Sequence, residues 1–278
     1  MKQVISLVLF GLFCGNAVVT NANGQNTTEG PSHSGRIVNG IPVNISNYKY
    51  ALSMRFDGEF ICGASIITYS HALTAAHCVY NYQFMSSRLT LYGGSTSASS
   101  GGVEFPVVRL LYHPSYNSYK SNLSDYDVAI LTVPANSFSG KPNMAPLALQ
   151  TKELPADTRC FVVGWGKRAD GENEQPSVNQ LLYANMNIVS QSDCATMWAN
   201  SEHRCPACKQ SITSNMVCAQ YGNSMDTCRG DSGGALVCGG RLTGVVSFAL
   251  YCSGIWPSVF AKVTAPTIRN FIRYIAGI

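Results

Sequence analysis

Charged side chains are scarce in this sequence. Of its 278 residues, 19 are Lys or Arg and 15 are Asp or Glu, which is 12% and about half of the ~25% found in an average globular domain. Because 46% of the residues are hydrophobic, so low a charge content excludes an intrinsically disordered chain. The net charge is only +4 and no run of five basic residues occurs, so we expect no nucleic-acid partner.

Internal repeats and long apolar or helical stretches are also missing, which excludes collagen, coiled coils and proteins that cross a membrane several times. One apolar stretch of about ten residues, Val4–Phe13, follows Lys2 and is too short to span a bilayer. It predicts a secretory signal peptide over residues 1–22, with cleavage after Ala22 preferred to cleavage after Ala17. A retained anchor is the alternative. We therefore expect a secreted, extracellular protein.

The eleven cysteines indicate the same compartment. Cys14 belongs to the predicted signal peptide, and the ten that remain are an even number, as expected of a disulfide framework in an oxidising environment. Acceptor sequences for N-glycosylation begin at Asn26, Asn44 and Asn122, and their use depends on exposure.

A change of character marks the start of the main domain. Residues 23–36 are mostly small and polar and end at Arg36, whereas an apolar segment begins at Ile37. A flexible polar run that ends in a single Arg is a good site for proteolysis. We therefore predict a propeptide over residues 23–36 and a folded domain over residues 37–278.

Short apolar runs separated by turn residues predict an all-β body, a sandwich or a barrel. Its two halves are expected to meet in residues 134–158, which hold four prolines, and residues 93–102 are expected to form a long hairpin loop rather than a linker. The apolar runs cover residues 64–67, 89–92, 107–111, 128–131, 160–163, 242–246 and 258–261.

The C-terminus carries a helical pattern. Ile268, Phe271, Ile272 and Ile275 recur at the spacing of one helix face, and Pro266 stands near the start. This pattern predicts one amphipathic helix that packs on the β body. Attachment of the helix to a membrane is the alternative.

Three residues are suited to nucleophilic chemistry. His77 ends an apolar run, and Asp127 directly precedes another. Ser232 stands among small residues that allow a sharp turn. A hydroxyl nucleophile is weak at neutral pH and needs a base, which in turn needs an orienting acceptor. The three residues supply these parts in the chain order His, Asp, Ser, at separations of 50 and 105 residues.

Short motifs surround these residues. They are Ile37-Val-Asn-Gly, Cys62-Gly-Ala-Ser, Thr74-Ala-Ala-His-Cys78, Asp127-Val-Ala-Ile-Leu, Gly164-Trp-Gly166, Gly230-Asp-Ser-Gly-Gly and Val246-Ser247. With them, the chain resembles the trypsin-like (chymotrypsin-fold) serine proteases over essentially all of residues 37–278. The resemblance implies two six-stranded antiparallel β-barrels packed together, with a C-terminal α-helix. The first barrel would cover approximately residues 37–145 and the second approximately residues 150–278.

The resemblance also implies a role for each residue. Ser232 would be the nucleophile, His77 the general base and later the general acid, and Asp127 the group that orients the imidazole. The backbone N–H groups of Gly230 and Ser232 would form the oxyanion hole. Asp125 competes with Asp127, but only Asp127 directly precedes the apolar strand.

By the same resemblance, cleavage after Arg36 would activate a zymogen. The new amine of Ile37 would insert beside Asp231, and this buried pair would order the oxyanion loop. Because an α-amino group has a pKa near ~8, activity is expected to fade at strongly alkaline pH. The other interpretation of Asp231, a helix or turn cap, is disfavoured because no helix is predicted to follow it.

Asp226 matches the base of the primary pocket in trypsin-like enzymes, where it would select Arg or Lys by charge pairing. Ser247, Ala249 and Ser258 are the other expected pocket residues. Trypsins have Gly at the positions of Ala249 and Ser258, so the slot is expected to be narrower, and Ser258 could hydrogen-bond to Asp226. Chymotrypsin- or elastase-like specificity is the alternative.

The resemblance pairs eight of the cysteines. Cys205 and Cys208 remain, and we expect a local Cys205–Cys208 disulfide. The alternatives are a redox motif, a metal site that includes His203, and re-pairing with Cys194 or Cys218. The implied pairs are Cys62–Cys78, Cys160–Cys238, Cys194–Cys218 and Cys228–Cys252.

No cofactor or metal is expected, because the loop after Tyr92 carries Gly and Ser where calcium-binding trypsins supply carboxylates. His71 and His113 have no matching context and are interpreted as structural. The expected partners are polypeptide substrates, an activating protease and protein inhibitors of proteases, with no membrane partner, and a monomer is expected. The resulting prediction is a secreted serine endopeptidase. The rivals are a non-catalytic protease homologue that serves as a binding module and an anion-binding secreted module.

Overall fold

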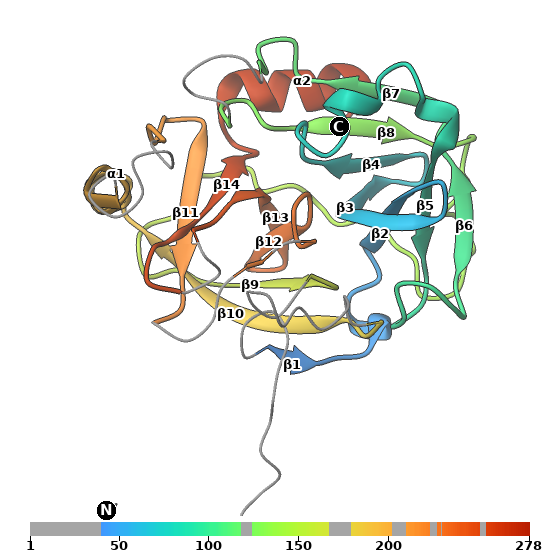
Figure 1. Cartoon of the computed structure of the whole chain (residues 1–278), viewed down its shortest axis with the longest axis horizontal. Coiled ribbons are helices and arrows are strands. Elements are labelled where there is room, and N and C mark those ends of the chain that lie inside the picture. The colour runs from blue at the N-terminus through green and yellow to red at the C-terminus, as the bar shows by residue number, and fades with distance from the viewer. Residues whose placement is uncertain are drawn as a thin grey trace, which may run out of the picture. The chain divides into compact units, whose positions relative to one another are not determined.

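The computed structural model describes residues 40–117, 124–166, 179–201, 210–222, 227–228, 230–250 and 254–278. Regular structure in these residues is mainly β, arranged as two antiparallel sheets, and two α-helices accompany them in the described part of the chain (Figure 1). The expected all-β fold with a C-terminal helix is therefore confirmed.

Seven strands from the N-terminal half form a curled sheet in the order β6-β5-β2-β3-β4-β8-β7. Its edge strands β6 and β7 are joined by Val107 and Val108. The Val107 amide donates to Leu89 O at 3.1 Å and the Val108 amide to Thr132 O at 2.8 Å, so one segment pairs with both ends of the sheet. The strands are β2 (Ala51–Phe56), β3 (Glu59–Thr68), β4 (His71–Thr74), β5 (Leu89–Gly93), β6 (Val103–Pro106), β7 (Arg109–Tyr112) and β8 (Ala129–Thr132).

The second sheet closes into a six-stranded barrel. Its order is β10-β11-β14-β13-β12-β9, and β10 also pairs with β9, which closes the ring. The short strand β1 adds to the outside of β10. The strands are β1 (Ile41–Pro42), β9 (Arg159–Gly164), β10 (Leu182–Val189), β11 (Met216–Gln220), β12 (Ala235–Cys238), β13 (Arg241–Phe248) and β14 (Ser258–Lys262).

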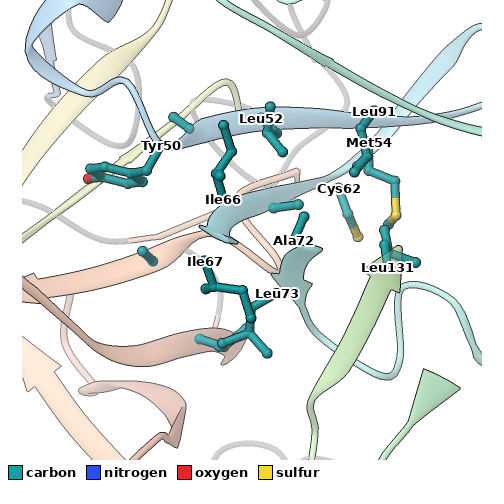
Figure 2. Close-up of a cluster of buried hydrophobic side chains, with 14 of the residues drawn as sticks. Tyr50, Leu52, Met54, Cys62, Ile66, Ile67, Ala72, Leu73, Leu91 and Leu131 are labelled. Carbon is teal, nitrogen blue, oxygen red and sulfur yellow. The ribbon is translucent and has the colours of Figure 1, made fainter. Parts of the chain in front are cut away.

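Burial of apolar side chains explains both sheets. Along β10, every second residue is buried, beginning at Leu182, as expected of a strand with one face on a core. Phe260 of β14 is fully buried in the same barrel. In the first sheet, apolar side chains from β2, β3, β4, β5 and β8 gather in one cluster (Figure 2). These include Leu52, Met54, Ile66, Leu73, Leu91 and Leu131.

The predicted C-terminal helix is present as α2 (Pro266–Ala276). Ile268 and Ile272 are fully buried, and Phe271 and Ile275 pack against the core, so the apolar face covers the β body as expected. A second helix, α1 (Gln191–Ser201), was not predicted from the sequence. Neither helix of the described residues is long and apolar enough to cross a membrane.

Disulfides tie the loops to the sheets. Three are present between described residues: Cys62–Cys78, Cys160–Cys238 and Cys194–Cys218. The last one joins α1 to β11 and leaves neither of its cysteines for re-pairing. Cys228 is disulfide-bonded as well. The expected partner Cys252 and the expected pair Cys205–Cys208 lie outside the described residues.

Candidate active site

Two neighbouring strands bring His77 and Asp127 together. β4 ends at Thr74, three residues before His77, and β8 begins at Ala129, two residues after Asp127. The strands are antiparallel, with Thr74 opposite Ala129, so the end of one lies beside the start of the other. His77 follows the end of β4 and Asp127 precedes the start of β8, so both residues lie near the same end of this strand pair.

Three hydrogen bonds fix the Asp127 carboxylate. The His77 amide donates to Oδ1 at 2.8 Å, and His77 Nδ1 donates to Oδ2 at 2.8 Å. The Ser247 hydroxyl of β13 also donates to Oδ2, at 2.5 Å. A carboxylate only accepts, so Nδ1 carries the imidazole proton and Nε2 of the neutral ring is left with its lone pair.

Exposure differs sharply between the two residues. Asp127 keeps 1% of its side chain exposed and His77 keeps 35%, so the carboxylate is shielded while the imidazole can meet a substrate. Burial lowers the pKa of His77, but the charge of Asp127 and the hydrogen bond to it raise the pKa, and the net result lies above the ordinary 6.5. The ring is thereby a stronger base than a free histidine.

Ser232 lies in a tight turn that packs against the first sheet. The Gly63 amide of β3 donates to Ser232 O at 2.8 Å, and the Gly233 amide donates to Val246 O of β13 at 2.9 Å. Gly233 has φ +81°, and a Cβ there would overlap the Thr74 hydroxyl. This close approach places the Ser232 turn against the end of β4, the strand that leads to His77.

The hydroxyl of Ser232 is not bonded to the imidazole in the described residues. Cys78 Sγ, which is part of a disulfide and carries no proton, lies 3.6 Å from His77 Nε2. A hydrogen bond between a hydroxyl nucleophile and its base is often long in a structure without substrate and shortens when substrate binds.

Two backbone N–H groups of the turn around Ser232 make no hydrogen bond to any described residue. The amides of Asp231, Gly233 and Gly234 donate to Cys228 O, Val246 O and Asp231 O. Within the described residues, the amides of Gly230 and Ser232 donate to no acceptor. Two unpaired N–H groups in one turn are suited to stabilise a developing negative charge.

Asp231 points away from these donors into a buried site. It is 3% exposed, and its carboxylate accepts from the Gly166 amide and the Cys228 amide, both at 3.0 Å. A Cβ at Gly166 would lie 2.5 Å from the carboxylate carbon, and one at Gly164 would overlap Oδ1. The Gly-Trp-Gly segment therefore makes room for a carboxylate. The residues expected to activate it, Arg36 and Ile37, lie outside the described residues.

Comparison with known proteins identifies the family. The Trypsin family matches residues 37–272 of this chain. The chain belongs to the trypsin family. Trypsin alpha of Drosophila erecta is 36% identical over 259 residues, which is 92% of this chain and 94% of that protein. Trypsin delta of Drosophila melanogaster is 36% identical over 260 residues, 92% of this chain and 95% of that protein. The chain is thus a serine endopeptidase that acts on polypeptides.

The expected specificity pocket of this trypsin-family protease is described in part. Ser258 is fully buried on β14, and its hydroxyl lies 2.8 Å from that of Thr227. Ala249 is half-buried. Ser247, expected in the pocket, directs its hydroxyl to Asp127. Asp226 lies outside the described residues.

His71 and His113 lie apart from the pair formed by His77 and Asp127. His71 Nδ1 is 2.8 Å from the Thr68 hydroxyl, and burial lowers the pKa of His71. His113 is buried and accepts from the Ser115 amide at 3.1 Å. Among described residues, neither histidine bonds to Asp127.

Asn44 of the first described glycosylation sequence is exposed, while Asn26 and Asn122 lie outside the described residues.

One cluster has the composition of a metal site. Ligand atoms of Cys62, His77 and Cys78 lie within 4.8 Å of one another. The two sulfurs are joined in a disulfide and offer no thiolate. This cluster of the trypsin-family protease is therefore a disulfide beside a histidine, not a metal centre.

Proposed function

We propose that this trypsin-family protease is secreted as a zymogen, is activated by cleavage after Arg36, and hydrolyses peptide bonds after Arg or Lys. Ser232, His77 and Asp127 act as the catalytic triad. An activating protease and protein inhibitors of proteases are its partners besides substrate, and it works as a monomer.

The hydrogen-bonded pair of His77 and Asp127 carries this proposal. The buried Asp127 carboxylate accepts from Nδ1 of the half-exposed imidazole and so selects the tautomer that a serine nucleophile needs. A histidine whose pKa is raised by a shielded carboxylate and whose Nε2 faces away from that carboxylate is typical of a catalytic base, which favours catalysis over a non-catalytic homologue.

The proposed reaction assigns one role to each of these residues. Ser232 Oγ attacks the substrate carbonyl while His77 Nε2 accepts the hydroxyl proton, and Asp127 stabilises the imidazolium. The unused amides of Gly230 and Ser232 support the oxyanion. His77 then protonates the departing amine, and water hydrolyses the acyl-enzyme by the same steps.

Activation is supported by the site around Asp231. Its buried carboxylate accepts two backbone hydrogen bonds, one of them from Gly166 across the turn, and flanks both oxyanion donors in sequence. A new Ile37 amine beside this carboxylate would form a buried ion pair, and removal of one partner of such a pair is strongly destabilising. Loss of the amine would loosen the turn that presents Gly230 and Ser232.

Catalysis is tested by amide hydrolysis with the full chain cleaved at Arg36. Ser232→Ala and His77→Ala are each expected to lower kcat by about 10⁶-fold, and the double variant no further, because the residues act as one unit. Absence of turnover in the wild-type protein with a verified Ile37 N-terminus would overturn catalysis and favour the binding-module alternative.

Specificity is tested with substrates that carry Arg, Lys, Phe, Leu or Ala before the scissile bond. Turnover restricted to Arg and Lys, and lost for these two in Asp226→Ser, supports charge selection. Preferred cleavage after Phe, Leu or Ala would retain the mechanism but establish a chymotrypsin- or elastase-like pocket.

Secretion and activation are tested together by expression in a secreting host. The protein in the medium is expected to begin at Asn23 and to gain activity only when an Arg-specific protease exposes Ile37. Arg36→Gln is expected to be secreted equally well and to stay inactive. Full activity of Arg36→Gln would overturn the zymogen.

A further inference from the structure

Asp125 makes a concentrated set of contacts near the candidate active site. Its Oδ1 accepts from the Tyr126 amide, from the Thr213 hydroxyl and from Asn215 Nδ2, each at 3.0 Å. Asp125 precedes β8 of the first sheet, while Thr213 and Asn215 precede β11 of the second barrel. One carboxylate oxygen thus joins the two sheets two residues before Asp127.

The residue between the two aspartates has an unusual backbone. Tyr126 has φ +55°, a left-handed conformation that is costly for a bulky side chain. The Val128 amide donates to Tyr126 O at 2.7 Å, which folds the chain tightly around Asp127. Such strain persists only where the surroundings hold it, and Asp125 holds it directly through the Tyr126 amide.

The Tyr126 ring is held from the other side. It stacks on His113 at a centroid distance of 4.8 Å and an interplanar angle of 14°. His113 itself is buried, and its amide donates to Val128 O at 2.9 Å. The left-handed turn therefore lies between a stacked ring and the Asp125 carboxylate, and its shape sets the direction of Asp127.

From this arrangement we propose that Asp125 is a positioning residue for the reaction: it anchors the left-handed turn at Tyr126 to the 213–215 loop, so that Asp127 meets both the amide and Nδ1 of His77. The proposal rests on the role of Asp127 in the proposed function.

The 213–215 loop is a suitable anchor because it is fixed without Asp125. The Met216 amide and Gln191 Nε2 both donate to Thr213 O, at 3.1 and 2.6 Å. The Lys262 amide of β14 donates to Asn215 O at 2.7 Å. Removal of Asp125 therefore frees the Asp127 segment while the anchor keeps its place.

The test compares Asp125→Ala, Asp125→Asn and the control Glu104→Ala. Glu104 is an exposed carboxylate of β6 that accepts from the Thr90 hydroxyl at 2.7 Å. Asp125→Ala is expected to lower kcat about tenfold with KM changed less than about twofold, because the proposed role of Asp125 acts through Asp127 and not on the substrate. Asp125→Asn keeps an acceptor oxygen and is expected to retain most activity.

A second readout separates positioning from stability. The pKa of His77, followed by NMR, is expected to fall toward its ordinary value in Asp125→Ala and to stay in place in the other two variants. The titratable groups that face this turn are His77, Tyr116 and His113, and burial lowers the pKa of His113. Individual assignment of the His77 resonance distinguishes its titration from that of His113 and Tyr116.

Either of two results would overturn the proposal. One is an Asp125→Ala variant with wild-type kcat and wild-type His77 pKa. The other is a lower melting temperature in Asp125→Ala with no change in the His77 pKa, which is a purely structural role. The NMR titration does not need turnover, so an inactive wild-type protein would contradict the proposed function while the positioning of Asp127 is still measured.

Discussion

The Ser247 hydroxyl lies 2.5 Å from Asp127 Oδ2, the oxygen that also accepts from His77 Nδ1. Ser247 belongs to β13 of the second barrel. His77 follows β4 of the first sheet, and Asp127 precedes β8 of the same sheet. A carboxylate buried to 1% exposure needs donors in place of water. The carboxylate is therefore oriented from both sheets, and its geometry depends on how they pack.

Ser247→Ala is expected to lower kcat/KM about tenfold. The variant leaves Oδ2 of Asp127 with one donor, and a hydrogen bond to a charged group is worth about 1.5–3 kcal/mol. Steady-state amide hydrolysis measures the loss. Ser53→Ala is the matched control, because Ser53 is also a buried strand serine, bonded to Ala98 O at 3.2 Å. Equal kcat/KM in wild type and Ser247→Ala would contradict the role assigned to this contact.

Activity is expected to rise with pH through a midpoint above 6.5. In the proposed function His77 must be neutral to accept the Ser232 proton, and Asp127 raises the pKa of His77 above its ordinary 6.5 despite burial. The acid limb of kcat/KM reports this free-enzyme pKa. In Asp127→Asn the residual activity should show a midpoint at lower pH, because the charge is gone. A wild-type midpoint at or below 6.5 would contradict the assignment.

Much of the fold was predictable because burial leaves a period in the sequence. The α2 face carries a helical period, and the strand that begins two residues after Asp127 carries a continuous apolar run, and the structure contains both elements. Helix α1 was not predicted, because Cys194 and Trp198 are the only buried residues among its described side chains. Two buried positions alone do not form a recognisable helical pattern in the sequence. Strand β1 was missed because two residues, both exposed, have no period at all.

The neighbourhood of His77 and Asp127 was predictable for a similar reason, since each stands at one end of an apolar strand. The contact of Ser247 with Asp127 spans 120 residues of sequence. That of Asp125 with Asn215 spans 90. A hydrogen bond between side chains so far apart leaves no pattern in spacing or composition, and only the packing of the two sheets creates it.

Phe260→Ala is expected to destabilise the protein by about 3–5 kcal/mol, the usual cost of an aromatic cavity in a core. Phe260 is fully buried on β14. A Cβ added at Gly244 would lie 2.7 Å from the Cβ of Phe260, so the barrel is filled around the Phe260 side chain. Urea unfolding measures the change, in the Ser232→Ala background, which under the proposed function cannot digest itself. Tyr274→Ala removes an aromatic that is 87% exposed and should change stability by less than about 0.5 kcal/mol.

Gly166→Ala is expected to lower kcat by about 10²–10³-fold, the effect of losing one oxyanion donor. The added Cβ would lie 2.5 Å from the Asp231 carboxylate, which lies between Gly230 and Ser232 in sequence and must move to make room. KM should change less, because the oxyanion donors bind the negatively charged oxygen of the transition state more strongly than the carbonyl oxygen of the bound substrate.

The matched control is Gly240→Ala in the β12–β13 turn. Gly240 has φ +73° and open space around it, so alanine there introduces backbone strain of about 1–3 kcal/mol without a clash. A fall in unfolding free energy with unchanged kcat is expected for Gly240→Ala, and a fall in kcat for Gly166→Ala. If both variants lost stability and kept kcat, the space beside Asp231 would serve folding alone, and the oxyanion turn would not depend on that carboxylate.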